Sequence, residues 1–374
     1  MTNIEQLRAA RFIASVFNHL AYSAPRPEKD KELSWAQILA MAKIHSVFGI
    51  VYSVFENELK TELTPEQFAL CQKEISIASA RHIAQKTAFS EIIKAFTEAD
   101  VYFMPLKGYH IKNLYPSPEL RTMNDIDVLV FPESQAAAKK ILLDMGYDFC
   151  AEGTVHDKYK KAPFIVIEVH KILSHSWNSY KLEESTPCSE NEYFRLMTPE
   201  DFFIFLLYHS VKHHTAGGCG LRTVFDISLV KKHVLNDVDI GALENRIKEL
   251  DLWDFYCKIN GLERLWFFGE DVSDEIFEFE LYTVSGGTYG TRVNYVSKEI
   301  KKGKVGFFFS RLFPPYSFMK MAFPVLNKAP VLLPVCYLWR ILKSLFTGSY
   351  KRDVLSVKES EEQRKKSNNG TKIN

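Results

Sequence analysis

The chain has few cysteines, and they are not arranged as a cross-linked or zinc-bound fold requires. The six cysteines are scattered along the 374 residues and form no C-x-x-C pair. Disulfide frameworks and structural zinc sites need close or regularly spaced cysteines, whereas scattered ones are typical of a reducing compartment. The sequence therefore predicts a cytoplasmic protein.

A long apolar run is also lacking. A membrane-spanning helix takes about 20 apolar residues, whereas the nearest candidate, residues 329–339, is short and contains Pro330 and Pro334. The first residues, 1–5, lack the basic-then-apolar layout of a signal peptide. Neither a spanning segment nor a secretory signal is predicted.

Net charge is nearly absent, at +1, so the totals favour neither a nucleic-acid-binding protein nor an acidic disordered one. Its distribution is uneven. Residues 297–352 contain 11 Lys or Arg and one acid, Glu299, a net +10 that leaves −9 for the rest of the chain.

The apolar pattern predicts an α+β protein, with a small mixed β-sheet core between helical N- and C-terminal segments. Helical periodicity covers an amphipathic stretch at residues 35–59 and a helix from Pro65 to about Ala99. Short apolar runs predict buried strands, and a helix capped by Ser134 follows the second strand. The strands are expected at residues 101–106, 126–131 and 164–170, and the helix at 134–145.

Helical periodicity returns after residue 198, and residues 269–280 then carry six acids and no base. We interpret the acidic segment as a boundary or an exposed insertion. Five parts are predicted: a helical N-terminal segment (1–98), the α/β core (99–195), its helical continuation (196–268), a basic aromatic helical subdomain (269–350) and a disordered tail (351–374).

Two carboxylates begin the second strand. Residues i and i+2 of a strand share a face, so Asp125 and Asp127 project together while Ile126 and Val128 enter the core. Such carboxylates can bridge two divalent cations about 3.5–4 Å apart, and Mg²⁺ is usually held by one or two carboxylates plus substrate phosphates. Taken alone, the pair also fits solvated acids at the start of an edge strand.

Candidate phosphate-binding residues precede the aspartates. Lys107 and Gly108 follow a strand and precede a predicted helix at 109–115. Glycine allows the backbone to approach a phosphate, and Lys107 adds positive charge. Arg121 can bind phosphate through two hydrogen bonds. For Lys107 and Gly108 the alternative is an ordinary turn.

The third strand supplies another acid. Alternation places Glu168 and His170 on one face, and a carboxylate in an apolar strand is costly unless it is paired or bound to metal. Glu168 is therefore expected to be a metal ligand or a general base. The alternative is a buried ion pair, for example with Arg121.

The order of these motifs resembles the uncharacterised nucleotidyltransferase family of the polymerase-β-like superfamily. The resemblance covers about residues 80–235, through Leu106-Lys107-Gly108, the Asp-Ile-Asp-Val-Leu-Val run, Glu168-Val169-His170, His209–His213 and Leu221–Ile227. It implies a minimal nucleotidyltransferase fold with Asp125, Asp127 and Glu168 as catalytic metal ligands. Lys-Gly replaces the Gly-Ser or Gly-Gly of better-known members, which removes the usual serine contact to the triphosphate.

Further polar residues are expected around the carboxylates or the acceptor. His209 and His213 lie one turn apart on a predicted helix, so with Glu168 or Asp226 they could hold a metal, although packing roles are the commoner case. We prefer a helical wall of the site in which Asp226 holds a histidine or Arg222.

The predicted reaction is attack by an acceptor hydroxyl on the α-phosphate of ATP or another nucleoside triphosphate, with two Mg²⁺ ions and release of pyrophosphate. A small molecule or glycan precursor is the favoured acceptor. The alternatives are a toxin-like transferase that nucleotidylates a protein or tRNA, and a catalytically silent nucleotide-binding module.

The basic stretch 297–352 interleaves Lys and Arg with aromatic residues. This composition predicts peripheral contact with an anionic membrane, and less favourably with nucleic acid. The alternative is a helical subdomain whose basic face packs on the acidic remainder of the chain.

Overall fold

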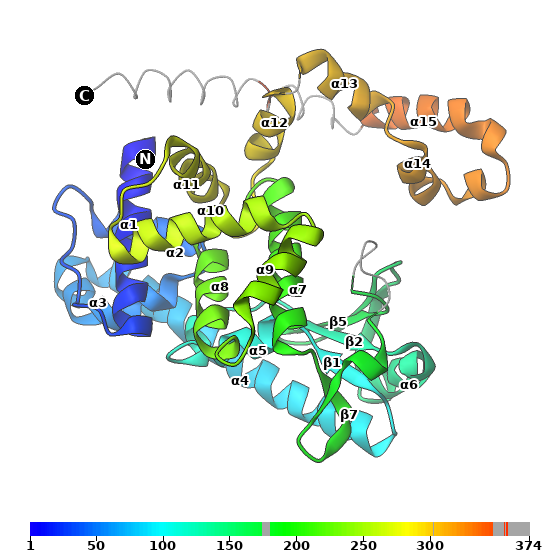
Figure 1. Ribbon diagram of the computed structural model, residues 1–374, viewed down its shortest axis with the longest axis horizontal. Coiled ribbons are helices and arrows are strands. Elements are labelled where there is room, and N and C mark those ends of the chain that lie inside the picture. The colour runs from blue at the N-terminus through cyan, green and yellow to red at the C-terminus, as the bar shows by residue number, and fades with distance from the viewer. Residues whose placement is uncertain (174–179, 302, 347–354, 356, 358–374) are drawn as a thin grey trace. The chain divides into compact units, whose positions relative to one another are not determined.

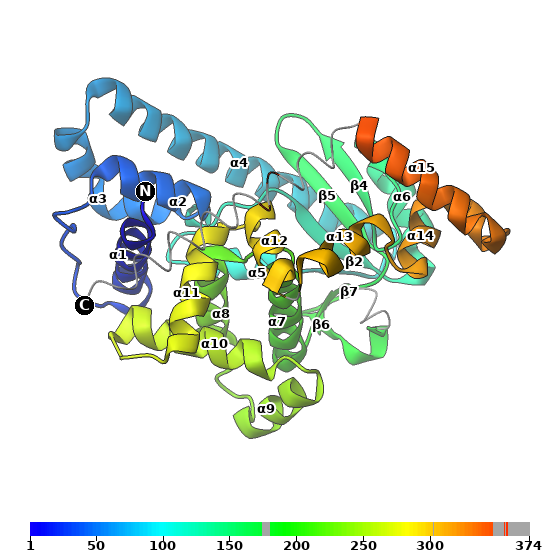
Figure 2. The same ribbon diagram turned by 90° about the horizontal axis from the view of Figure 1, so that it is seen from above.

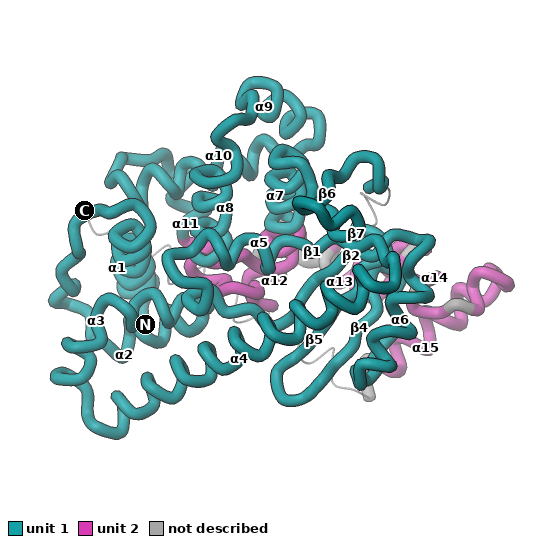
Figure 3. The backbone as a smooth tube through the Cα atoms, turned by 90° about the horizontal axis from the view of Figure 1, so that it is seen from below, with its two compact units in different colours: residues 1–211, 221–280 teal, residues 212–220, 281–374 magenta. Residues whose placement is uncertain are grey.

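The structure is a computed structural model that describes residues 1–173, 180–301, 303–346, 355 and 357 (Figure 1). The chain divides into two compact units (Figure 3). Unit 1 comprises residues 1–211 and 221–280, and unit 2 comprises 212–220 and 281–374. Almost all of the predicted disordered tail, 351–374, lies outside the described residues.

Unit 1 begins with helices whose starts are encoded locally. Three helices begin with a capping box, in which two side chains satisfy free backbone N–H groups at the helix start. The pairs are Thr2 with Glu5, Ser34 with Gln37 and Thr64 with Gln67. These helices are α1 (Asn3–Tyr22), α2 (Trp35–Ile44) and α4 (Pro65–Glu98), with α3 (Phe48–Glu62) between the last two.

The amphipathic stretch expected at residues 35–59 is two helices rather than one. The chain leaves the helical conformation between α2 and α3, where Ser46 has a left-handed φ of 56°. There the ring of His45 accepts a hydrogen bond from the Leu221 backbone N–H at 3.1 Å. Apolar periodicity continues across the break, so the sequence pattern did not reveal it.

A seven-stranded mixed sheet follows, in the order β3-β4-β5-β2-β1-β7-β6. Strand β2 pairs antiparallel with β1 and parallel with β5, and β5 pairs antiparallel with β4. The α+β fold class is confirmed. The strands are β1 (Phe103–Pro105), β2 (Ile126–Val130), β3 (Asp148–Ala151), β4 (His156–Lys161), β5 (Ile165–His170), β6 (Thr186–Cys188) and β7 (Asn191–Leu196).

The two faces of the sheet have different surroundings. One face of the sheet is covered by α4 and α6 (Gln135–Asp144) (Figure 2). Phe89, Ile92 and Leu142 of these helices are buried in one cluster with Ile126, Val128 and other strand residues. On the other face Leu129 joins a smaller apolar cluster with Phe205. Alternation along β2 therefore directs Asp127 away from the α4 side.

Ser134 does not cap α6 with its side chain. Its hydroxyl instead accepts the backbone N–H of Tyr102 at 3.0 Å and so joins α6 to the segment before β1. The predicted helix is present at 135–144, but this tertiary contact takes the place of the expected local cap.

Helices complete both units. Helix α5 (Gly108–Lys112) lies between β1 and β2. The helices after the last strand are α7 (Pro199–Thr215), α8 (Gly220–Val234), α9 (Ile240–Glu249), α10 (Trp253–Glu263) and α11 (Asp274–Gly286). Unit 2 contains α12 (Arg292–Lys301), α13 (Lys304–Leu312), α14 (Tyr316–Ala322) and α15 (Leu333–Phe346). No helix in the described part of the chain is long and apolar enough to cross a membrane.

The acidic segment 269–280 is not simply an exposed insertion, because its last acid, Glu280, is fully buried. Arg11 of α1 donates to both oxygens of this carboxylate, at 2.9 and 2.7 Å, and the indole N–H of Trp266 donates at 2.7 Å. A buried carboxylate needs such partners. This contact fastens α11 to α1 within unit 1.

We predict that Arg11→Ala lowers the free energy of unfolding by about 2–3 kcal/mol, because it leaves the buried Glu280 charge without its cation. The measurement is chemical denaturation. Arg264→Ala is the control, since Arg264 faces Glu270 at 3.9 Å with both side chains exposed, and should cost less than about 1 kcal/mol. Equal losses in the two variants would contradict this role of Arg11.

Candidate functional site

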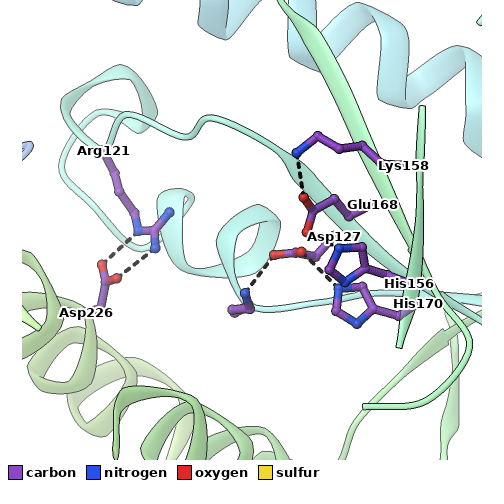
Figure 4. A network of polar contacts seen from close by, with 8 residues as sticks. Arg121, Asp127, His156, Lys158, Glu168, His170 and Asp226 are labelled. Atoms are coloured by element: carbon purple, nitrogen blue, oxygen red, sulfur yellow. Dashed lines mark hydrogen bonds and ion pairs between the residues drawn. The ribbon is translucent and has the colours of Figure 1, made fainter. Parts of the chain in front are cut away.

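Asp127 lies at the centre of a polar cluster on the sheet (Figure 4). Its Oδ2 is 2.9 Å from Nζ of Lys107, and its Oδ1 is 3.1 Å from Nε2 of His170. Burial disfavours the carboxylate charge, but Lys107 and His170 outweigh it and hold the pKa of Asp127 well below its usual range. Asp127 is therefore an anion at neutral pH.

Glu168 lies beside Asp127 because β2 and β5 run parallel in register. Asp127 pairs with Glu168 across the two strands, and Lys158 of β4 pairs with Glu168 from the other side. Residues paired in this way point to the same face. Nζ of Lys158 is 2.9 Å from Oε1 of Glu168, and Nε2 of His156 is 3.4 Å from Oε2. The predicted third carboxylate thus has Lys158 and His156 as partners, not Arg121.

Asp125 precedes β2 and is half-buried near the other acids. Burial, and then the charge of Asp127, raises the pKa of Asp125, while Lys107 opposes this shift. Two carboxylates this close repel each other unless positive charge lies between them. The pair is therefore electrostatically suited to a cation.

His156, Glu168 and His170 each offer a ligand atom, and these atoms lie within 4.8 Å of one another. Burial lowers the pKa of His156 despite the opposing charge of Glu168, which favours the neutral ring that a metal requires. Among the described residues this is the only such group of three. Its histidines come from β4 and β5 and are not His209 or His213.

The segment that leads into Asp125 is anchored at four consecutive residues. Arg121 donates through Nε and a terminal nitrogen to both oxygens of Asp226, at 2.8 and 2.7 Å. Each of the next three residues accepts one hydrogen bond. Arg222 donates to the Thr122 carbonyl at 3.0 Å, and Gln85 donates to the Met123 carbonyl at 2.9 Å. Arg81 donates to the side-chain oxygen of Asn124 at 3.2 Å.

Asp226 binds Arg121 and Tyr115, partners that the sequence analysis did not assign to it. Both charged side chains are more than nine-tenths buried, and the Tyr115 hydroxyl donates to Asp226 at 2.8 Å. Burial and the Asp226 charge raise the pKa of Tyr115 well above its usual value, so it remains a donor. The contact of Arg222 with Thr122 was also unforeseen.

The remaining predicted residues lie as follows. Gly108 begins α5, and a Cβ there would come within 2.7 Å of Sδ of Met123, so any larger residue would have to displace that side chain. His209 and His213 lie one turn apart on α7, as expected from their spacing.

Sequence reasoning missed His156, Lys158, Arg81 and Gln85. His156 and Lys158 lie two residues apart on β4. This strand is rich in lysine, so a search for short apolar runs does not find it. Arg81 and Gln85 lie one turn apart on α4, and only that i,i+4 spacing hinted at a shared face.

We predict that Asp226→Asn destabilises unit 1 by about 3 kcal/mol, because it leaves the buried guanidinium of Arg121 without its anionic partner. Replacing both residues together, by Arg121→Met and Asp226→Leu, should cost clearly less than the two single changes summed. Denaturation of the single and double variants measures the coupling. Additive losses would show that the two side chains do not depend on each other.

Comparison with known proteins gives a family match and weak similarities to solved structures. No curated protein matches the chain. A solution structure of the antibiotic-resistance factor ANT(2'')-Ia has 13% identity and a TM-score of 0.35, over 49% of this chain and 96% of that chain. A crystal structure of ANT(2")-Ia in complex with adenylyl-2"-tobramycin has 13% identity and a TM-score of 0.34, over 46% and 99%.

Scores this low carry no argument about function. The model of the uncharacterised nucleotidyltransferase family, by contrast, matches residues 31–268. That range contains every residue of the polar cluster and of the anchored segment, and it covers more than half of the 374 residues. The chain therefore belongs to the family of uncharacterised nucleotidyltransferases, as the sequence motifs had indicated.

Proposed function

We propose that the chain moves a nucleoside monophosphate from a nucleoside triphosphate to an acceptor hydroxyl and releases pyrophosphate. Asp125, Asp127 and Glu168 are its catalytic carboxylates. The observation that carries this proposal is the register of Asp127 with Glu168 on adjacent parallel strands, two residues after Asp125. Membership of the family supports the class of reaction.

The donor set fits magnesium. Three carboxylates supply hard oxygen ligands. The pKa of Asp125 is raised first by burial and then by the charge of Asp127, and a divalent cation would stabilise the charged form of this carboxyl. His170 lies 3.1 Å from Asp127 and fixes the direction of that carboxylate. We propose that Asp125, Asp127 and Glu168 hold two Mg²⁺ ions, which when bound neutralise the charge that develops on the phosphates.

Lys107 is proposed to bind the triphosphate. Its ammonium already lies in the cluster, 2.9 Å from Asp127, on a flexible stem that can turn toward an arriving anion. Gly108 keeps the backbone beside it free of a side chain. Arg121 uses two of its nitrogens on Asp226, so we now propose it as a positioning residue that holds the aspartate segment in place.

In the proposed step, an acceptor oxygen attacks the α-phosphorus in line with the bridging oxygen to the β-phosphate. The new P–O bond forms as the bridging P–O bond breaks, and pyrophosphate leaves with the electron pair. Glu168 takes the proton of the attacking hydroxyl, while Lys158 and His156 hold its two oxygens in place.

The acceptor is proposed to be a hydroxyl of a small molecule or glycan precursor. The direct test incubates the purified chain with Mg²⁺, each of the four labelled nucleoside triphosphates and a cell extract, then identifies the labelled product. Label on protein or tRNA would favour a toxin-like transferase. Nucleotide binding without any release of pyrophosphate would indicate a silent binding module and refute the proposal.

For the carboxylate pair we predict that Asp125→Asn, alone and together with Asp127→Asn, lowers nucleotide transfer by about three orders of magnitude, because charge that faces the phosphates is lost. The single variant keeps the contacts of Asp127 with Lys107 and His170, so its fold is the better protected. Thermal stabilisation by Mg²⁺ should disappear as well.

Asp148→Asn is the matched control, because Asp148 is exposed at the start of β3. It should keep the parent rate and the parent response to Mg²⁺. A parent-like rate in the Asp125→Asn variant would instead remove Asp125 from the site.

For Glu168 we predict that Glu168→Gln lowers turnover by about 10²–10⁴-fold while Mg²⁺–nucleotide affinity changes little, since shape is kept and basicity is lost. Turnover and nucleotide binding are measured on the same preparation, beside the exposed Glu183→Gln. A drop in melting temperature at unchanged turnover would make Glu168 a structural member of the ion pair with Lys158. An equal loss of binding and turnover would mean that Glu168 acts as a metal ligand only and not also as the base.

A further inference from the structure

Helix α15 packs on its own unit through one face only. Buried Cys336 meets Met319 and Leu326 in a small core, against which Leu333 and Tyr337 also pack. The Tyr337 hydroxyl donates to the carbonyl of Pro314 at 2.7 Å. One arc of α15 is thus fixed to the segments around α14.

The opposite arc of α15 is apolar and exposed to solvent. Val335, Leu338, Trp339 and Leu342 follow the i, i+3, i+4, i+7 spacing of one helix face. Their exposed fractions are 62, 59, 60 and 41%, and Val331 just before the helix is 84% exposed. Isolated exposed apolar residues are common, but a continuous exposed face marks an interaction surface.

The charged residues of the segment that carries this face are all basic. Residues 300–352 contain ten Lys or Arg and no acid. Among them Lys328 and Lys343 are exposed, the second of them on α15 itself. An exposed apolar stripe beside bases and without acids has the chemistry of a helix that lies in an anionic lipid surface.

We propose that α15 docks unit 2 on an anionic phospholipid bilayer, with its apolar face among the acyl chains and its lysines at the headgroups. A helix of 14 residues extends roughly 21 Å, less than the hydrocarbon core of about 30 Å. The helix therefore lies in the plane of the surface and does not span it. Trp339 occupies the headgroup depth that tryptophan prefers.

Two other occupants fit the surface less well. A second copy would bring one acid-free basic stretch against another, and the charges would repel. RNA would use stacking on aromatic rings, but three of the four residues of the exposed face are aliphatic. The inference rests on unit 2 alone and does not depend on nucleotidyl transfer.

The test is flotation of the full-length protein with phosphatidylcholine vesicles that contain or lack phosphatidylserine. Binding should require phosphatidylserine and should fall at roughly 1 M salt, where the Debye length is about 3 Å. The double change Leu338→Ser with Trp339→Ser should weaken binding by at least about tenfold. Lys343→Glu should weaken it by about fivefold or more.

Matched controls lie on α4, in unit 1. Leu70 has an exposed fraction of 63%, and Lys73 is also exposed, so Leu70→Ser and Lys73→Glu should bind like the parent. Brominated acyl chains should quench part of the parent's tryptophan emission, and Trp339→Phe should abolish that quenching while binding remains.

Several results would overturn the inference. These are failure to bind phosphatidylserine vesicles, equal binding to neutral vesicles, and a double variant that binds like the parent. A dimer that Trp339→Ser dissociates, or RNA binding, in the absence of vesicle binding would assign the face to those partners instead.

Discussion

A buried ion pair, Arg121 with Asp226, joins residues 105 positions apart and fixes the backbone that leads into the aspartates. Carboxylates placed close together repel each other, so the free chain would separate them. Anchors on Arg121, Thr122, Met123 and Asn124 prevent this. A buried pair of this kind adds little net stability over apolar residues. Its effect is positional, because it makes one placement of the aspartate segment much more favourable than others.

The two faces of the sheet carry different kinds of residue, because successive side chains of a strand point to opposite faces. On the α4 side, Ile126 and Val128 are almost fully buried among aromatic and aliphatic residues. Asp127 of β2 and Glu168 of β5 meet lysines and histidines on the opposite side. A shift of one residue in the register of β2 would turn Asp127 toward α4 and its apolar neighbours away from it. The apolar core thus enforces the position of Asp127.

Local signals made much of the fold predictable. The helix start at Pro65 and apolar periodicity located α4, and apolar runs located β2 and β5 with the acids on them. Polar strands such as β4 were missed, since their pairing depends on partners and not on their own residues. The partner of Asp226 was also missed, because a contact across 105 residues leaves no spacing pattern. The sequence thus indicated the kind of chemistry, whereas the contacts that orient it required the structure.

The C-terminal helices differ from the site in how their charged and apolar side chains are placed. In the polar cluster, Asp127 and Glu168 are largely buried, and each has a lysine as its partner of opposite charge. In residues 300–352, bases occur without acids, and α15 exposes a row of apolar side chains. The family match ends at residue 268, before this region begins. Exposure of apolar surface to water is unfavourable, and nothing in the part of the chain that matches the family requires it. An environment other than water therefore gives the simplest physical account of this face.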